Sequence, residues 1–183
     1  LGVQKNVAAI YADGTNGSST FVTDTIVGKE ITSYSGNKLN DERATPNASK
    51  ALSIVNKTAN NKGIVIKFNM TGYKDAELSF ATRGTAAGFK THYYEYSTNG
   101  TDFIHFETIP AVTSSTWALE TVNLTEITAI NNASDVYIRI KFDGATSATG
   151  NNRLDNILIK AYKGIYVDEV PPVATSASLT SFS

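Results

Sequence analysis

The segment from Gly150 to Ile159 carries the clearest chemistry in the chain. A polar stretch, Gly150-Asn151-Asn152-Arg153, reads as a loop that runs into the short apolar strand Leu154-Asp155-Asn156-Ile157-Leu158-Ile159. Side chains along a strand alternate between faces, so Asp155 is predicted to share a face with Ile157 and Ile159. If that face borders the core, the carboxylate needs a partner, because an unpaired buried charge is costly.

Three kinds of partner fit the Asp155 carboxylate. It could bind Ca²⁺, which prefers carboxylate and carbonyl oxygens, with Asp13 and Asp143 as the next oxygen donors. It could pair with an arginine, Arg83 or Arg153. It could also accept hydrogen bonds from backbone N–H groups. Arg83, Arg153 and Asn156 are therefore expected to have structural roles.

Aromatic side chains suggest a second kind of chemistry, because a flat ring can stack on the apolar face of a sugar. The candidates for binding a glycan are Trp117, Tyr93, Phe103, Tyr137 and Tyr34. The structural alternative is that the tryptophan fills the core and the tyrosines cover the sheet faces with their hydroxyl groups in water.

Catalytic chemistry has weaker support. His92 and His105 are predicted to face opposite sides of one hairpin, which argues against a shared acid–base or metal pair. His105 beside Glu95 resembles a catalytic dyad, but we interpret the two residues as a cross-strand polar pair. The remaining carboxylates are scattered, and no nucleophile elbow or phosphate-binding loop is present. We therefore expect no enzyme activity, with a β-sandwich hydrolase, active on polysaccharide or nucleic acid, as the rival hypothesis.

Composition narrows the class of protein. The 183 residues include 16 Lys and Arg against 17 Asp and Glu, and this near-neutral balance argues against nucleic-acid binding. The chain has no cysteine, so disulfides and cysteine metal sites are excluded. No apolar run approaches the ~20 residues of a membrane span. We expect a monomer.

Nearly every periodic segment has period two, which is typical of half-buried antiparallel strands. Strands are predicted at 7–11, 31–34, 51–55, 64–68, 78–80, 90–97, 102–108, 117–123, 136–142 and 154–163, with one short helical turn within 124–131. Many short strands and almost no helix predict an all-β, two-sheet antiparallel jelly-roll β-sandwich. A three-residue bulged loop at Asn99-Gly100 is expected to place Tyr94 and Tyr96 on one face with Ile104 and Phe106.

The chain divides into a predicted module, residues 1–165, and a tail, 166–183. Pro171-Pro172 and the Ala/Thr/Ser-rich end suggest a linker to a following module.

Four strings taken together resemble a known type of module. They are Asn69-Met70-Thr71-Gly72-Tyr73, Leu78-Ser79-Phe80-Ala81-Thr82-Arg83-Gly84-Thr85, Glu95-Tyr96-Ser97-Thr98-Asn99-Gly100-Thr101-Asp102-Phe103 and Asn151-Asn152-Arg153-Leu154-Asp155-Asn156-Ile157. In this order they resemble jelly-roll accessory modules of secreted multidomain proteins from Bacteroidetes-type bacteria, which are similar in plan to carbohydrate-binding modules and galactose-binding-like domains.

The resemblance implies a non-catalytic module of an exported or cell-surface protein that binds glycan or acts as a spacer or adhesion unit. It also implies a possible structural Ca²⁺ near Asp155, and neighbouring modules as partners. A purely structural module without a ligand is the remaining alternative, since β-sandwiches host all these roles.

Overall fold

The computed structural model describes residues 20–22, 25–42, 48 and 50–164. The predicted strand at 7–11, Asp13 and the predicted linker 166–183 lie outside the described residues. The strands are β1 (Thr20–Val22), β2 (Ile31–Ser35), β3 (Lys50–Val55), β4 (Lys62–Phe68), β5 (Tyr73–Gly84), β6 (Thr91–Ser97), β7 (Ile104–Pro110), β8 (Ala118–Asn123), β9 (Val136–Asp143) and β10 (Asn151–Lys163).

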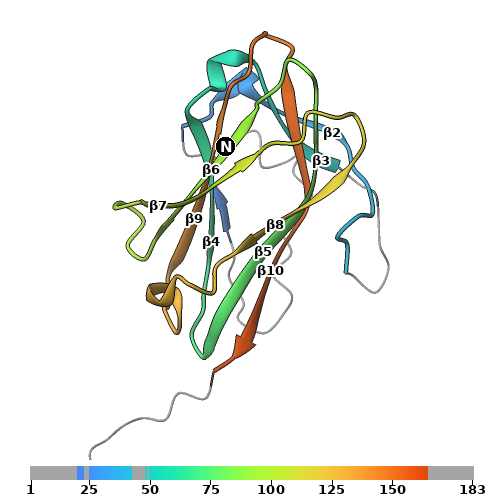
Figure 1. Cartoon of the computed structure of the whole chain (residues 1–183). Helices are drawn as coiled ribbons and strands as arrows, with labels where there is room; N and C mark the ends of the chain where they lie inside the picture. The colour runs from blue at the N-terminus through green and yellow to red at the C-terminus, as the bar shows by residue number, and fades with distance from the viewer. Residues whose placement is uncertain (1–19, 23–24, 43–47, 49, 165–183) are drawn as a thin grey trace, which may run out of the picture.

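These strands form two antiparallel sheets that face each other. Sheet I has the order β1-β4-β9-β6-β7 and sheet II the order β2-β3-β10-β5-β8. Figure 1 shows the sheets as two layers, with β4, β9 and β6 on one side and β3, β10, β5 and β8 on the other. The all-β sandwich expected from the sequence is therefore the observed fold.

The hydrophobic core lies between the sheets and follows the period-two pattern. In β9 the side chains alternate strictly between buried and half-buried positions from Val136 to Asp143. The period-two pattern of the sequence predicts ten core residues, and each is buried in the core or packs against it: Ile66, Phe68, Leu78, Phe80, Tyr94, Tyr96, Ile138, Ile140, Ile157 and Ile159. Period-two alternation therefore located the inner faces of both sheets correctly.

The β6–β7 hairpin has the predicted register at its tip. Tyr96 pairs with Ile104 and Glu95 with His105, and a bulge follows between Tyr94 and Glu95. Tyr94 and Tyr96 both contact the ring of Phe106. His92 is fully buried whereas His105 is exposed, so the two histidines do lie on opposite faces.

Strand β10 corrects the predicted face of Asp155. The strand begins at Asn151 rather than after the polar stretch, and its pairing with β5 shifts between Asp155 and Leu158. Asn156 has a φ of 50°, so it is the extra residue of a β-bulge. Leu154 and Ile157 consequently both point inward, and Asp155 lies on the outer face of sheet II, opposite Ala81.

Helical structure in the described residues is confined to three single 3₁₀ turns: η2 (Gly28–Glu30), η3 (Lys57–Ala59) and η4 (Thr128–Ile130). The last lies within the predicted helical turn, where Asn123 accepts a hydrogen bond from the Thr125 backbone. No described helix has the length and apolar character needed to cross a membrane.

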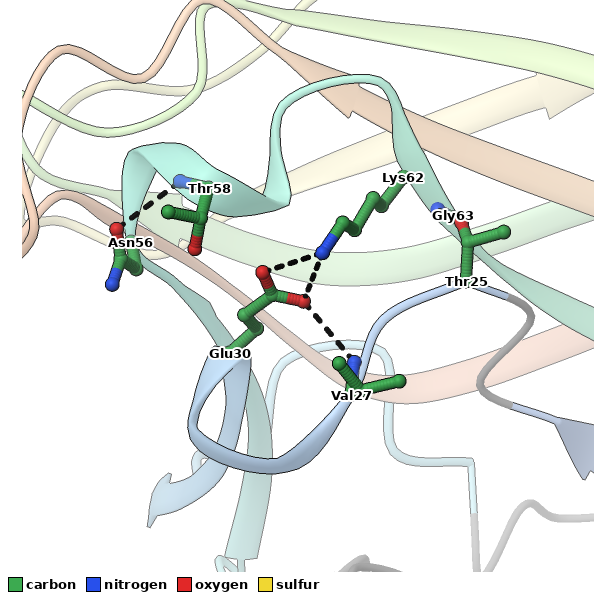
Figure 2. A network of polar contacts seen from close by, with 7 residues as sticks. All are labelled: Thr25, Val27, Glu30, Asn56, Thr58, Lys62 and Gly63. Carbon is green, nitrogen blue, oxygen red and sulfur yellow. Dashed lines mark hydrogen bonds and ion pairs between the residues drawn. The ribbon is translucent and has the colours of Figure 1, made fainter.

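An ion pair holds η2 against the start of β4. Figure 2 shows Lys62 reaching the Glu30 carboxylate, which also accepts the Val27 backbone N–H; Lys62 Nζ lies 2.6 and 2.8 Å from the two carboxylate oxygens. Burial by itself raises the pKa of Glu30, but the hydrogen bonds from Lys62 and Val27 outweigh it and lower the pKa below its usual value. The pair therefore stabilises the folded state at neutral pH.

Candidate functional site

Two arginines and two aromatic residues meet on the outer face of sheet II. Arg153 of β10 lies directly opposite Arg83 of β5 in the strand register. Residues opposite each other in an antiparallel pair have side chains on the same face. Their neighbours Leu154 and Thr82 point inward, so both guanidinium groups belong to the outer face. We call Tyr34, Arg153, Arg83 and Trp117 the arginine–aromatic row.

The row is held together by stacking. The Arg153 guanidinium carbon lies 3.4 Å from the centre of the Tyr34 ring. The Arg83 guanidinium carbon lies between the two aromatics, 5.8 Å from the Tyr34 ring and 5.7 Å from the Trp117 ring. A cation above an aromatic face is attracted by the ring quadrupole, by ~0.5–2 kcal/mol. Each ring therefore helps to orient an arginine on this face.

Small side chains lie beneath the row. Ala51, Ser53 and Ala81 belong to the outer face by register, yet they are buried at 0, 3 and 0 % exposure. Their small size leaves the space above them to the long arginine side chains. Tyr34 and Trp117 come from opposite edges of the sheet, β2 and the residue just before β8, but both rings lean toward Arg83, so their centres are at most about 11.5 Å apart.

The arginines have unused hydrogen-bonding capacity. Within the described part of the chain, the Nε atoms of Arg83 and Arg153 are buried and donate to no acceptor. Burial lowers the pKa of the Arg153 guanidinium, Tyr34 opposes this effect and the charge of Arg83 adds to it. The row is thus a site of concentrated positive charge in which two buried N–H donors have no acceptor among the described residues.

Asp155 and Asn156 fasten the loop after β2 next to the row. One Asp155 oxygen accepts the Asn37 backbone N–H at 2.7 Å and the Asn37 side-chain amide at 3.2 Å; the other accepts the Asn156 N–H at 3.0 Å. The Asn156 side chain donates to the carbonyls of Asn37 and Leu39. Asp155 is 7 % exposed and accepts N–H groups, so the prediction of a buried, partnered carboxylate is confirmed, and backbone donors are among its partners.

The other aromatic candidates belong to a different face. Tyr93, Phe103 and Tyr137 lie on the outer side of sheet I, separated from Tyr34 and Trp117 by the whole sandwich. Arg139 covers Phe103, with its guanidinium carbon 3.9 Å from the ring centre, and pairs with Glu95. Lys67 lies 5.2 Å from the Tyr137 ring centre and pairs with Asp135. The structure therefore divides the predicted aromatics into two groups and brings only Tyr34 and Trp117 together.

A polar cluster inside the core was not predictable from local sequence patterns. His92 Nδ1 lies 2.9 Å from Glu120 Oε1, the Tyr94 hydroxyl donates to the same carboxylate, and Asn152 contacts the far ring nitrogen of His92 at 3.4 Å. Burial raises the pKa of Tyr94 well above its usual value, and the charge of Glu120 raises it further. The exposed fractions of His92 and Tyr94 are both 0 %, so this cluster is inaccessible to a substrate and instead links the two sheets.

The calcium candidates do not converge. Asp143 ends β9 in sheet I and Asp155 lies in β10 of sheet II, and no group of three His, Cys, Asp or Glu residues in the described ranges could hold a metal. Both Asp155 oxygens accept hydrogen bonds from N–H groups, and a bound cation would repel these donors. These surroundings fit the backbone-donor alternative better than Ca²⁺.

The Gly84–Gly88 loop packs against the start of β10. A side chain at Gly150 would come within 1.9 Å of the Ala87 carbonyl, and one at Gly88 within 2.4 Å of the Asn151 carbonyl. Glycine is required here because two backbone segments touch. The loop connects strands and supports β10.

No protein-family model and no curated protein matches the chain. Solved structures resemble it in fold. TmCBM61 in complex with β-1,4-galactotriose matches with a TM-score of 0.49 and 10% identity, covering 81% of this chain and 92% of that one. A putative sugar binding protein from Bacteroides thetaiotaomicron matches with a TM-score of 0.49 and 10% identity over 82% and 90% of the two chains. The K2 cleaved adhesin domain of Lys-gingipain matches with a TM-score of 0.48 and 14% identity over 81% and 94%.

At TM-scores below 0.5 and identities of 14% or less, these matches concern the fold alone. Their low identities assign no ligand to this chain. Its function has to be argued from its own surface.

Proposed function

We propose that this chain is a non-catalytic glycan-binding module of an exported protein, and that the arginine–aromatic row is its binding surface. The observation that carries the proposal is the placement of Tyr34 and Trp117 on one sheet face with two arginines between them. Aromatic rings offer flat apolar area for a pyranose ring, and the intervening N–H donors suit its hydroxyl groups.

The shape of the face supports an extended ligand rather than a single sugar. The two rings flank the Arg83 guanidinium, with their centres at most about 11.5 Å apart, so a ligand that contacts both rings must reach across the arginine. Tyr34 is 42 % exposed and Trp117 is half-buried, so both retain ring area for contact. Asp155 and Asn156 hold the loop after β2, and this limits the ordering cost of binding at Tyr34.

The proposed lack of catalysis has separate support. The contact between Glu120 and His92 is buried in the core, where a substrate cannot reach it. Asp155 is engaged in accepting N–H groups from the backbone. Glu42 pairs with Lys160 at 2.5 Å. The described carboxylates near the row are therefore engaged in structural contacts. The exported setting rests on the resemblance of the four strings to modules of secreted proteins.

The test is a glycan-array screen of the purified chain and its variants. Tyr34→Ala and Trp117→Ala should each lose most of the array signal, because each removes one stacking ring. The matched controls are Tyr162→Ala, which removes a tyrosine that is 72 % exposed at the far end of β10, and Phe103→Ala on sheet I; both should bind like the wild type.

Three results would contradict the proposal. One is equal loss in the control variants, which would place the ligand elsewhere. Another is an array without any signal, which would favour a purely structural module. The third is release of reducing sugar from a bound glycan, abolished by a single carboxylate substitution, which would favour the hydrolase alternative.

A further inference from the structure

The two arginines of the row differ from the other cations that contact aromatic rings. On sheet I, Arg139 covers Phe103 and pairs with Glu95, and Lys67 contacts Tyr137 and pairs with Asp135. Arg83 and Arg153 lie opposite each other with no ion pair to a carboxylate among the described residues.

This arrangement has an energetic cost. Two like charges on adjacent strands repel each other, and each Nε is a buried donor without an acceptor among the residues that the structure describes. Arg153 is only 9 % exposed, so water compensates little of its lost hydration. Asp155 lies two residues along β10 on the same face, but its described contacts are with the N–H groups of Asn37 and Asn156.

The Tyr34 ring holds the Arg153 guanidinium in one orientation. Its guanidinium stacks on the Tyr34 ring at 3.4 Å, so one flat side is covered by the aromatic. The N–H groups of a guanidinium lie in its plane, and they match the two oxygens of a carboxylate as a fork. A stacked arginine is therefore fixed in advance for a planar anion.

Resting on the glycan-binding function proposed above, we infer that the ligand is an acidic polysaccharide, and that Arg83 and Arg153 bind the carboxylate of a uronic acid residue in it. Tyr34 and Trp117 then contact the sugar rings on either side of that residue. The carboxylate offsets the repulsion between the arginines and accepts hydrogen bonds from their terminal N–H groups.

Affinity electrophoresis of the whole chain tests this with a pair of probes that share a backbone. Polygalacturonate carries free carboxylates, and fully methyl-esterified polygalacturonate carries the same sugars without the charge. We expect binding to the first to be at least about tenfold tighter, because a hydrogen bond to a charged group contributes ~1.5–3 kcal/mol. This comparison requires no substitution and is unaffected by any loss of folding.

The arginines are then tested directly. Arg83→Gln and Arg153→Gln should each weaken binding to polygalacturonate about tenfold to a hundredfold. Arg153→Lys should also weaken it, because lysine keeps the charge but loses the fork. Arg139→Gln on sheet I is the matched control and should bind like the wild type. Circular dichroism of each variant is the control for correct folding.

The possible failures are distinguishable. Equal binding to the free and esterified polymers, or a neutral galactan bound through Trp117 without any effect of Arg83→Gln, would overturn this inference and leave the proposed function standing. Tighter binding to dextran sulfate than to polygalacturonate would overturn the carboxylate assignment. Absence of binding to any glycan would remove both proposals together.

Discussion

Replacing Asp155 by alanine should destabilise the fold by removing the acceptor that fastens the loop after β2. The carboxylate accepts N–H groups at 2.7, 3.2 and 3.0 Å, two from Asn37 and one from Asn156. Each hydrogen bond contributes ~1 kcal/mol net, and a donor left without an acceptor in a buried site costs more. We therefore expect Asp155→Ala to lose ~2–4 kcal/mol of unfolding free energy.

Urea unfolding followed by circular dichroism measures this change at constant m-value. The matched control is Asp135→Ala, whose carboxylate is 44% exposed and pairs with Lys67 at 2.5 Å. An exposed ion pair contributes ~0–1 kcal/mol, so this variant should unfold close to the wild type. If Asp155→Ala and Asp135→Ala unfold at the same urea concentration as the wild type, Asp155 does not hold the loop and our reading of β10 is wrong.

Three further changes test other parts of the structure. Glu120→Ala should cost ~3–5 kcal/mol in urea unfolding, because it leaves the Tyr94 hydroxyl and His92 without their acceptor in the core, whereas Glu126→Ala on the surface should cost little; equal effects would refute the buried network. The stability advantage of the wild type over Glu30→Gln should be full above pH 4.5 and shrink as the pH falls through the lowered pKa of Glu30, and an advantage that grows on acidification would have the wrong sign. Chelation should leave the melting temperature of the wild type unchanged, since the described Asp155 contacts are N–H donors; a fall in the wild type but not in Asp155→Ala would instead establish calcium.

The sequence predicted the sandwich well because its strands alternate cleanly. Ile138 and Ile140 alternate with Arg139 and Lys141, and a strand with this pattern has one possible inner face. The hairpin tip was also predictable, since Gly100, at a φ of 78°, allows the turn that pairs Tyr96 with Ile104.

The face of Asp155 was not predictable from alternation. A bulge inserts one residue and reverses the faces beyond it, and nothing in the apolar pattern marks Asn156 as that residue. A weak signal exists, because asparagine tolerates positive φ better than β-branched residues do. The prediction of a buried, partnered carboxylate held nevertheless, because the loop after β2 supplies the donors.

The arginine–aromatic row depends on strand order, which local patterns do not encode. Tyr34, Arg83, Trp117 and Arg153 come from four separate parts of the chain and meet only because sheet II has the order β2-β3-β10-β5-β8. The two arginines were considered only as partners of Asp155, and their stacking on aromatics was missed. The contact between Glu120 and His92 was likewise not predictable, because the two residues lie in different sheets and meet only where the sheets pack.

The fluorescence of Trp117 tests the central claim most directly, because it is the only tryptophan in the chain and lies in the row. Titration with polygalacturonate should shift or quench its emission with a saturating curve, and Arg83→Gln should move the midpoint to higher glycan concentration. Phe103→Ala should leave the curve unchanged. A glycan that binds, as judged by electrophoresis, without altering Trp117 emission would contradict the placement of the binding surface on sheet II.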